Sequence, residues 1–209
     1  MFNIFLGDMV ILDDKENIID WGEKMTIGKL DFKPIIDNPN MVPKCIYDFV
    51  NGYDNLDVKK QFMVSQINPD FADGNRLCEE YSIDKSLGFN CLIVECRRNE
   101  IVKYCALVVP IGYKYNMGSV VRKYTNSRVV SVASLDYVLE KTQMEYGSIT
   151  PIGLPSDWMI LVDPLIKEQK QIIIGGGFVN AKISLPVELF LKLPNVEIVE
   201  GIAKEVNIS

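Results

Sequence analysis

Two long apolar runs on either side of a short polar segment stand out in the middle of the chain. The runs cover residues 91–96 and 101–109, and the segment between them reads Arg97-Arg98-Asn99-Glu100. Apolar runs rich in Val, Ile and Leu that flank a polar turn are typical of a β-hairpin. The sequence therefore predicts two long antiparallel strands at this position.

Weaker patterns predict shorter elements around this hairpin. Apolar or alternating runs predict strands at residues 60–67, 128–132, 158–163, 171–174 and 181–185. Helical spacing and capping residues predict helices at 44–52, 69–81, 116–124 and 134–141, and a closing helix that begins at Pro186. Strands in successive hairpins, with helices between some of them, indicate an α/β protein of the α+β type. We expect a mixed, largely antiparallel curved sheet or partial barrel flanked by helices, not a doubly wound parallel fold.

The first part of the chain has a different character. Short apolar pieces at residues 10–12 and 18–19 flank a charged segment at 13–17, which predicts a small hairpin. We interpret residues 1–55 as an N-terminal extension packed on a main domain of residues 56–209. At 209 residues, the chain is long enough for such a domain to bury a sizeable core.

Composition and charge narrow the classes of function. Hydrophobic residues at 48% and charged residues at 24% are ordinary for a globular protein, and no apolar run has the length of a membrane span. We therefore expect a cytoplasmic protein without a membrane partner. A formal charge of −6 argues against a broad nucleic-acid-binding surface, but it is compatible with a small contact to one RNA end. Basic residues that either hold an anion or form solvated faces are Arg97, Arg98, Lys103, Lys114, Arg122 and Arg128.

The cysteines and the lack of histidine exclude several kinds of site. The five cysteines show no CxxC spacing, and the chain has no histidine. Zinc sites of the Cys/His type and catalytic Cys-His or Ser-His pairs are therefore excluded. We expect free, mostly buried thiols, and neither a metal nor an organic cofactor.

Two glycine-rich segments are the candidates for a binding loop. Residues 146–155 read YGSITPIGLP, with two glycines, two prolines and two small hydroxyl residues. This glycine–proline loop is either a fixed ligand-binding loop or an ordinary connection between a helix and a strand. Residues 175–177 form a second segment, the glycine turn. It joins two strands and lacks the lysine or serine of a phosphate-binding loop, so we interpret it as a turn or bulge.

The order of these motifs resembles the YbaK/EbsC family of aminoacyl-tRNA deacylases. This family is related to the editing domain inserted in bacterial prolyl-tRNA synthetases. The resemblance covers about residues 56–195, and its most specific part is the glycine–proline loop, which is similar to the GxxxP loop of the family. The strand ending in Asp163, the glycine turn and the strand at 181–185 follow in the family's order.

The resemblance implies a function and a site. Members of the family hydrolyse the ester that joins a wrong amino acid to the 3′ end of tRNA, so the implied partner is an aminoacyl-tRNA 3′ end. The backbone of Gly147 and Ser148 is expected to hold the ester carbonyl as its oxygen becomes negative. A positioned water or the terminal hydroxyl of the tRNA replaces a protein nucleophile. The other implied substrate contacts are Thr150, Pro151, Gly153, Asp163, Gly175 and Gly176.

One departure from the family leaves two hypotheses open. Family deacylases carry a lysine near the start of the first sheet strand, where this chain has Asn90. Asparagine is neutral and shorter, so catalysis is weakened, is transferred to another lysine such as Lys103, or is lost. The first hypothesis is a freestanding deacylase in which Asn90 replaces the lysine. The second is a non-catalytic module that binds an amino acid, a nucleotide or an aminoacylated ligand.

Overall fold

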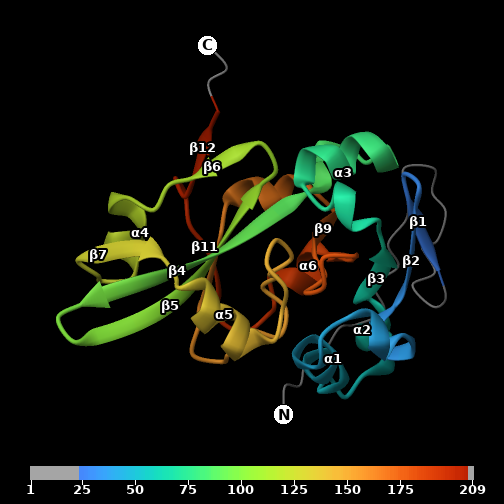
Figure 1. Ribbon diagram of the computed structural model, residues 1–209, viewed down its shortest axis with the longest axis horizontal. Coiled ribbons are helices and arrows are strands. Elements are labelled where there is room, and N and C mark those ends of the chain that lie inside the picture. The colour runs from blue at the N-terminus through green and yellow to red at the C-terminus, as the bar shows by residue number, and fades with distance from the viewer. Residues whose placement is uncertain (1–23, 207–209) are drawn as a thin grey trace.

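The computed structural model describes residues 24–206, and the predicted hairpin runs from the middle of the molecule to its left edge in Figure 1. Its strands are β4 (Phe89–Arg98) and β5 (Ile101–Pro110), which pair antiparallel from end to end. Asn99 turns the chain between them with a left-handed φ of 54°, a conformation that asparagine tolerates well. The prediction of two long strands is confirmed.

Two five-stranded sheets form the body of the protein. The first sheet contains, in order, β1 (Met25–Ile27), β2 (Leu30–Pro34), β3 (Met63–Gln66), β10 (Ala181–Pro186) and β9 (Gln171–Gly175). The second sheet contains, in order, β11 (Val196–Ile198), β8 (Met159–Val162), β5, β4 and β7 (Val129–Val132). A separate pair is formed by β6 (Tyr113–Tyr115) and β12 (Ala203–Glu205).

The two sheets meet where β4 begins. A parallel bridge joins Gly88, just before β4, to Ile173 in β9. Within the sheets, β8 pairs in parallel with β5 and with β11, and the other strand pairs are antiparallel. The result is a curved, largely antiparallel arrangement of strands with helices around it, so the predicted fold class is confirmed.

The helices are short and lie around the sheets. They are α1 (Lys44–Asn51), α2 (Leu56–Lys60), α3 (Gly74–Tyr81), α4 (Ser119–Tyr124), α5 (Leu135–Thr142) and α6 (Val187–Phe190). Single 3₁₀ turns occur at Ile35–Asp37, Pro39–Met41, Pro69–Phe71 and Lys85–Leu87, and a longer one at Pro164–Glu168.

Three details of the predicted elements are wrong. The helix predicted at 69–81 is interrupted, because Asn68 caps a single 3₁₀ turn and Asp73, in an extended conformation, caps a new helix through Asn75 and Arg76. The strand predicted at 60–67 shortens to β3, because α2 continues to Lys60. The predicted cap of α5 makes no side-chain hydrogen bond to the helix.

The N-terminal part of the described chain contributes to the first sheet. Strand β2 pairs with β3 through Lys33–Val64 and Pro34–Met63. Residues on both sides of the expected boundary at residue 55 therefore share one sheet, and the division into extension and domain stays a prediction. The hairpin predicted around residues 10–19 lies outside the described residues. Within residues 24–206, no helix has the length and apolar character that crossing a membrane requires.

Candidate functional site

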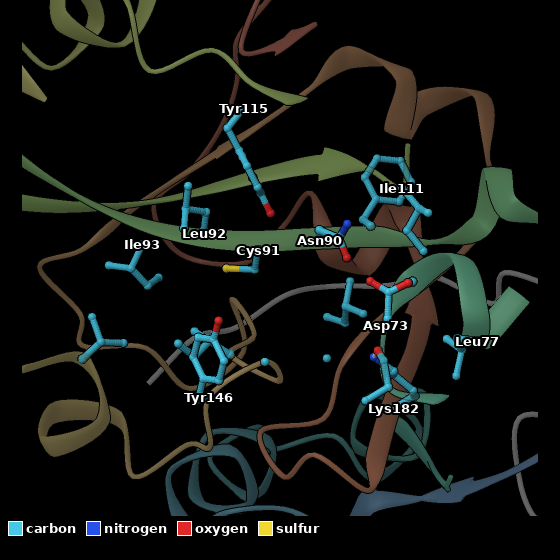
Figure 2. A pocket seen from close by; sticks show the side chains of 18 of the residues that line it. Asp73, Leu77, Asn90, Cys91, Leu92, Ile93, Ile111, Tyr115, Tyr146 and Lys182 are labelled. Atoms are coloured by element: carbon cyan, nitrogen blue, oxygen red, sulfur yellow. Dashed lines mark hydrogen bonds between the residues drawn. The ribbon is translucent and has the colours of Figure 1, made fainter. Parts of the chain in front are cut away.

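A cavity of about 470 Å³ opens where the two sheets approach each other (Figure 2). Its walls come from the first half of β4, the end of β9, strand β10, the start of α3, and the glycine–proline loop. Most of the lining is apolar, including Phe89, Ile93 and Ile173. An apolar cavity with a few polar groups is the usual form of a small-ligand site.

The glycine–proline loop presents backbone to this cavity at Gly147. This residue has a left-handed φ of 84°, and a side chain added to it would meet no atom within 4 Å. Among residues 24–206, its N–H donates to no protein acceptor. Gly147 therefore offers an unused donor at the edge of an open space, which is the property required of a group that binds a carbonyl oxygen.

Ser148 has the opposite environment. Its hydroxyl donates to the carbonyl oxygen of Phe178 at 2.7 Å and accepts from the N–H of Gly176 at 3.2 Å. Its own N–H donates to the carbonyl oxygen of Glu145, and its side chain is nearly inaccessible, with a residue exposure of 2%. Ser148 therefore fastens the loop to the glycine turn, and its N–H is already in use.

Close packing explains the first glycine of that turn. A side chain at Gly175 would lie 2.6 Å from the carbonyl oxygen of Ser148, so only glycine allows the loop to approach β9 this closely. The N–H of Gly177 also donates to that same oxygen at 2.9 Å. The two glycine-rich segments that the sequence singled out thus form one hydrogen-bonded unit beside the cavity.

Two polar side chains enter the cavity from facing strands (Figure 2). Asn90 comes from β4, at the position where the resemblance placed a lysine. Lys182 comes from β10, and its ammonium donates to the carbonyl oxygen of Ala72 at 2.9 Å. Burial lowers the pKa of Lys182 to about 8, although the negative charge of Asp73 acts in the opposite direction.

Two further titratable groups of the cavity, Tyr115 and Cys91, are neutral at pH 7. Tyr115 points into the cavity from β6, and burial raises the pKa of its phenol (Figure 2). Burial also raises the pKa of the Cys91 thiol to about 12, so this cysteine is not a thiolate nucleophile. The cavity therefore offers hydrogen-bond donors, one ammonium and the acidic side chain of Asp73, but no activated nucleophile of its own.

Comparison with known proteins identifies the fold family. Residues 68–193, more than half of the chain, match the aminoacyl-tRNA editing domain. The chain belongs to this family. No curated protein matches it.

Solved structures share the fold of this editing domain at low sequence identity. The hypothetical protein APE2540 is 20% identical with a TM-score of 0.57, covering 66% of this chain and 90% of its own. A candidate trans-editing enzyme for prolyl-tRNA synthetase is 13% identical with a TM-score of 0.60, covering 71% and 89%. A scaffold protein from a computational epitope-grafting study is 11% identical with a TM-score of 0.64, covering 78% and 97%. At these identities the likeness concerns the fold.

The structure separates the expected site residues of the editing domain into two groups. Asn90, Gly147 and Gly175 line the cavity together. The others support it or lie elsewhere. Ser148 and Gly176 fix the loop through the hydrogen bond from the Gly176 N–H to the Ser148 hydroxyl. Thr150 and Pro151 are buried in the loop, and the Thr150 hydroxyl has no hydrogen-bond partner among the described residues. Gly153 packs against the backbone of Cys45 in α1.

The last two expected residues lie away from the cavity. Asp163 accepts a hydrogen bond from the N–H of Leu165 and caps the 3₁₀ turn after β8. Lys103 lies exposed on β5, opposite Cys96 in the half of the hairpin beyond the cavity. None of the basic residues singled out in the sequence lines the cavity; these are Arg97, Arg98, Lys103, Lys114, Arg122 and Arg128.

Sequence reasoning missed Lys182. The signal was a lysine inside the apolar strand at 181–185, directly after the glycine turn. A lysine in the interior of a strand that is buried on both faces needs a reason, because its charge is costly to remove from water. The cysteines, in contrast, behave as predicted: all five are free and at least partly buried. Among the described residues, no group of three or more His, Cys, Asp and Glu side chains is placed to hold a metal.

Proposed function

We propose that this editing domain is a trans-acting aminoacyl-tRNA deacylase of the YbaK/EbsC type, which hydrolyses the ester of a misacylated tRNA. The observation that carries the proposal is the unused N–H of Gly147 at the edge of the cavity, in a chain that belongs to the editing-domain family. Asn90 stands in this branch where the related deacylases have lysine. The proposal implies a cytoplasmic protein, because aminoacyl-tRNA is made and used there.

The reaction requires few protein groups. A water oxygen bonds to the ester carbonyl carbon, the bond from that carbon to the ribose oxygen breaks, and the proton from water goes to the ribose oxygen. The products are the free amino acid and tRNA with a free terminal hydroxyl. The Gly147 N–H stabilises the carbonyl oxygen while it is negative, and a donor of this kind typically contributes about 100- to 1,000-fold in rate. Ser148 acts as a positioning residue, because it fixes the loop that carries this N–H.

The walls of the cavity select the substrate in this proposal. Asn90 and Gly175 lie on its surface and contact the ligand directly. Gly176, Thr150, Pro151 and Gly153 maintain the loop that forms one wall. A cavity of about 470 Å³ has room for an aminoacyl group with part of the terminal nucleoside.

A second candidate function is a binding module without catalytic activity. Two observations favour it: the neutral Asn90 in the place of a lysine, and the absence from the cavity wall of the six basic residues named above. A surface that receives the end of an RNA is usually more basic than this wall. The module would keep the cavity for an amino acid, a nucleotide or an aminoacylated ligand.

Hydrolysis of a panel of aminoacyl-tRNAs separates the two functions. The panel contains alanyl, seryl and cysteinyl esters on proline-specific tRNA, with Gly147→Ala and the matched control Gly52→Ala. We expect selective hydrolysis by the parent and a fall in kcat/KM of at least about tenfold for Gly147→Ala. The reason is that alanine costs about 1–2 kcal/mol at a φ of 84°, which strains the loop that carries this N–H.

The control lies in ordinary backbone. Gly52 follows α1 with a φ of −71°, so Gly52→Ala should retain full activity. Turnover by Gly147→Ala at the parental rate would contradict the role of the loop. No turnover of any ester by the parent would favour the binding module.

A further inference from the structure

Lys182 is buried more deeply than its protein contacts justify. The residue is 7% exposed, and among residues 24–206 its ammonium makes one hydrogen bond, to the carbonyl oxygen of Ala72. A lysine ammonium has three donors, so two have no partner in the described part of the chain. Among residues 24–206, no carboxylate forms an ion pair with it. Buried ammonium groups are normally paired, because leaving water is costly for a charge.

The hydrogen bond to Ala72 does not explain the choice of lysine. A neutral donor would satisfy one carbonyl oxygen without a charge to desolvate. The side chain instead lines the same cavity as Gly147, Asn90 and Gly175. In Figure 2 it lies beside Asp73, on the side of the cavity that Asn90 faces from β4.

The charged and titratable groups around Lys182 leave it positive at neutral pH. Asp73, at the start of α3, favours the charged ammonium, while its carboxylate is occupied with capping that helix. Cys78, one turn further along α3, has a raised pKa because of burial and stays a thiol. Asp84 and Lys85 act on Cys78 with opposite signs, and the other titratable cavity groups, Cys91 and Tyr115, are neutral.

We propose that Lys182 is the ligand-binding cation of this cavity and contacts a negatively charged oxygen of the substrate. The oxygen belongs either to the phosphate of the terminal nucleotide or to the ester carbonyl as it becomes an oxyanion. The proposal deepens the deacylase function and rests on it. It means that the positive charge that β4 lacks at Asn90 is supplied from β10, a different strand in the facing sheet.

The test compares two substitutions that remove the charge in different ways. Lys182→Met keeps the length of the side chain without any polar group, and Lys182→Gln keeps a donor for Ala72 without the charge. The exposed Lys192→Met serves as the matched control. The measurements are kcat and KM for the most reactive ester of the panel, the melting temperature, and the pH dependence of kcat/KM.

We expect kcat/KM to fall about 10- to 100-fold in both Lys182 variants, while Lys192→Met matches the parent. A contact to phosphate raises KM, and a contact to the oxyanion lowers kcat. The melting temperatures should not fall below that of the parent, because replacing the ammonium removes a desolvation cost. In the parent, kcat/KM should decline as the pH rises through about 8, where Lys182 loses its proton, and the variants should lack this decline.

Two results would overturn the proposal. One is kcat/KM within about twofold of the parent in both variants. The other is a loss of activity in Lys182→Met that parallels a loss of melting temperature and is restored by Lys182→Gln, which would mean that Lys182 only supports Ala72.

A parent that hydrolyses no ester would defeat the deacylase function but not the role of Lys182. Calorimetric titration with AMP then decides. Binding by the parent that weakens at least about tenfold in both variants supports the ligand-binding cation. No binding of AMP by the parent, or equal affinity in all three proteins, overturns it.

Discussion

Ser148 and Lys182 are both polar residues buried beside the cavity, and they differ in how fully the protein satisfies them. Every hydrogen-bonding group of Ser148 has a partner: its N–H binds Glu145, its carbonyl oxygen binds Gly177, and its hydroxyl binds Phe178 and Gly176. The Lys182 ammonium has a single partner among residues 24–206.

The difference shows how to distinguish a structural polar group from a functional one in the same place. A buried group that is fully hydrogen-bonded stabilises the fold, and its loss leaves other groups unpaired. A buried group with unused donors contributes little to the fold and retains its capacity for a ligand. Substitution of Ser148 should therefore mainly lower the stability of the protein, whereas substitution of Lys182 should mainly lower its activity.

The largest expected effect on stability is that of Ser148→Ala. The substitution removes two hydrogen bonds inside the protein, each worth about 1–2 kcal/mol when a partner is left buried. We expect the free energy of unfolding to fall by about 2–4 kcal/mol in urea denaturation. Activity should fall as well, because the loop loses its attachment to the glycine turn.

The exposed Ser156→Ala is the control, since its side chain makes no hydrogen bond in the described structure. It should change the free energy of unfolding by less than about 0.5 kcal/mol. If Ser148→Ala were as stable as this control, the distinction between a structural Ser148 and a functional Lys182 would be wrong.

The second effect concerns the pH dependence of stability. Folded Lys182 has a pKa of about 8, against 10.5 in an unfolded chain. Between these values the unfolded state binds more protons, so Lys182 makes the protein more stable as the pH rises, by about 3 kcal/mol in total. Urea denaturation at pH 7.5 and pH 10 should show that the free energy of unfolding of the parent rises relative to that of Lys182→Met, because buried groups with raised pKa values, such as Cys91, act equally in both proteins. Parallel curves would mean that the folded pKa is not lowered.

The smallest expected effect is a rescue across the cavity. Asn90→Lys should add less than about threefold to kcat/KM in the parent, because Lys182 already supplies a charge. In Lys182→Met, the same substitution should restore activity by about tenfold, because the new ammonium enters the same cavity from β4. An equal gain in kcat/KM in the parent and in Lys182→Met would show that a lysine at position 90 does not replace the function of Lys182.

The parts of this fold that the sequence predicts are those that neighbouring residues determine. The hairpin of β4 and β5 is such a case, since its pairing depends on a turn at Asn99 and on the apolar runs beside it. The interruption before α3 was missed, although Asp73 and Gly74 carry a local signal for a new helix start. The single helix was predicted from Asn68 as the cap and Pro69 at the first helical position, and in the structure these two residues begin only a 3₁₀ turn.

The cavity could be predicted only in part, because it depends on contacts between distant segments. The glycine–proline loop was recognisable by its composition, but the bond from Ser148 to Phe178 joins residues 30 positions apart. Lys182 can be recognised as a cavity residue only when the curvature of the two sheets places β10 opposite Asn90. No local pattern specifies that curvature. For this reason the sequence suggested Lys103 as the replacement for the missing lysine, although Lys103 lies outside the cavity.

The short strands β1 and β2 affect whether copies of the protein can associate through the edges of their sheets. Without them, β3 would present a row of unpaired N–H and C=O groups at the rim of the sheet, a template for pairing with another molecule. Among residues 24–206, the rim of this sheet is β1, with three residues, next to the ion pair between Lys24 and Asp31. Short, charged rims resist edge-to-edge aggregation. We therefore expect the hairpin of β1 and β2 to hinder pairing between copies of the protein along that side of the sheet.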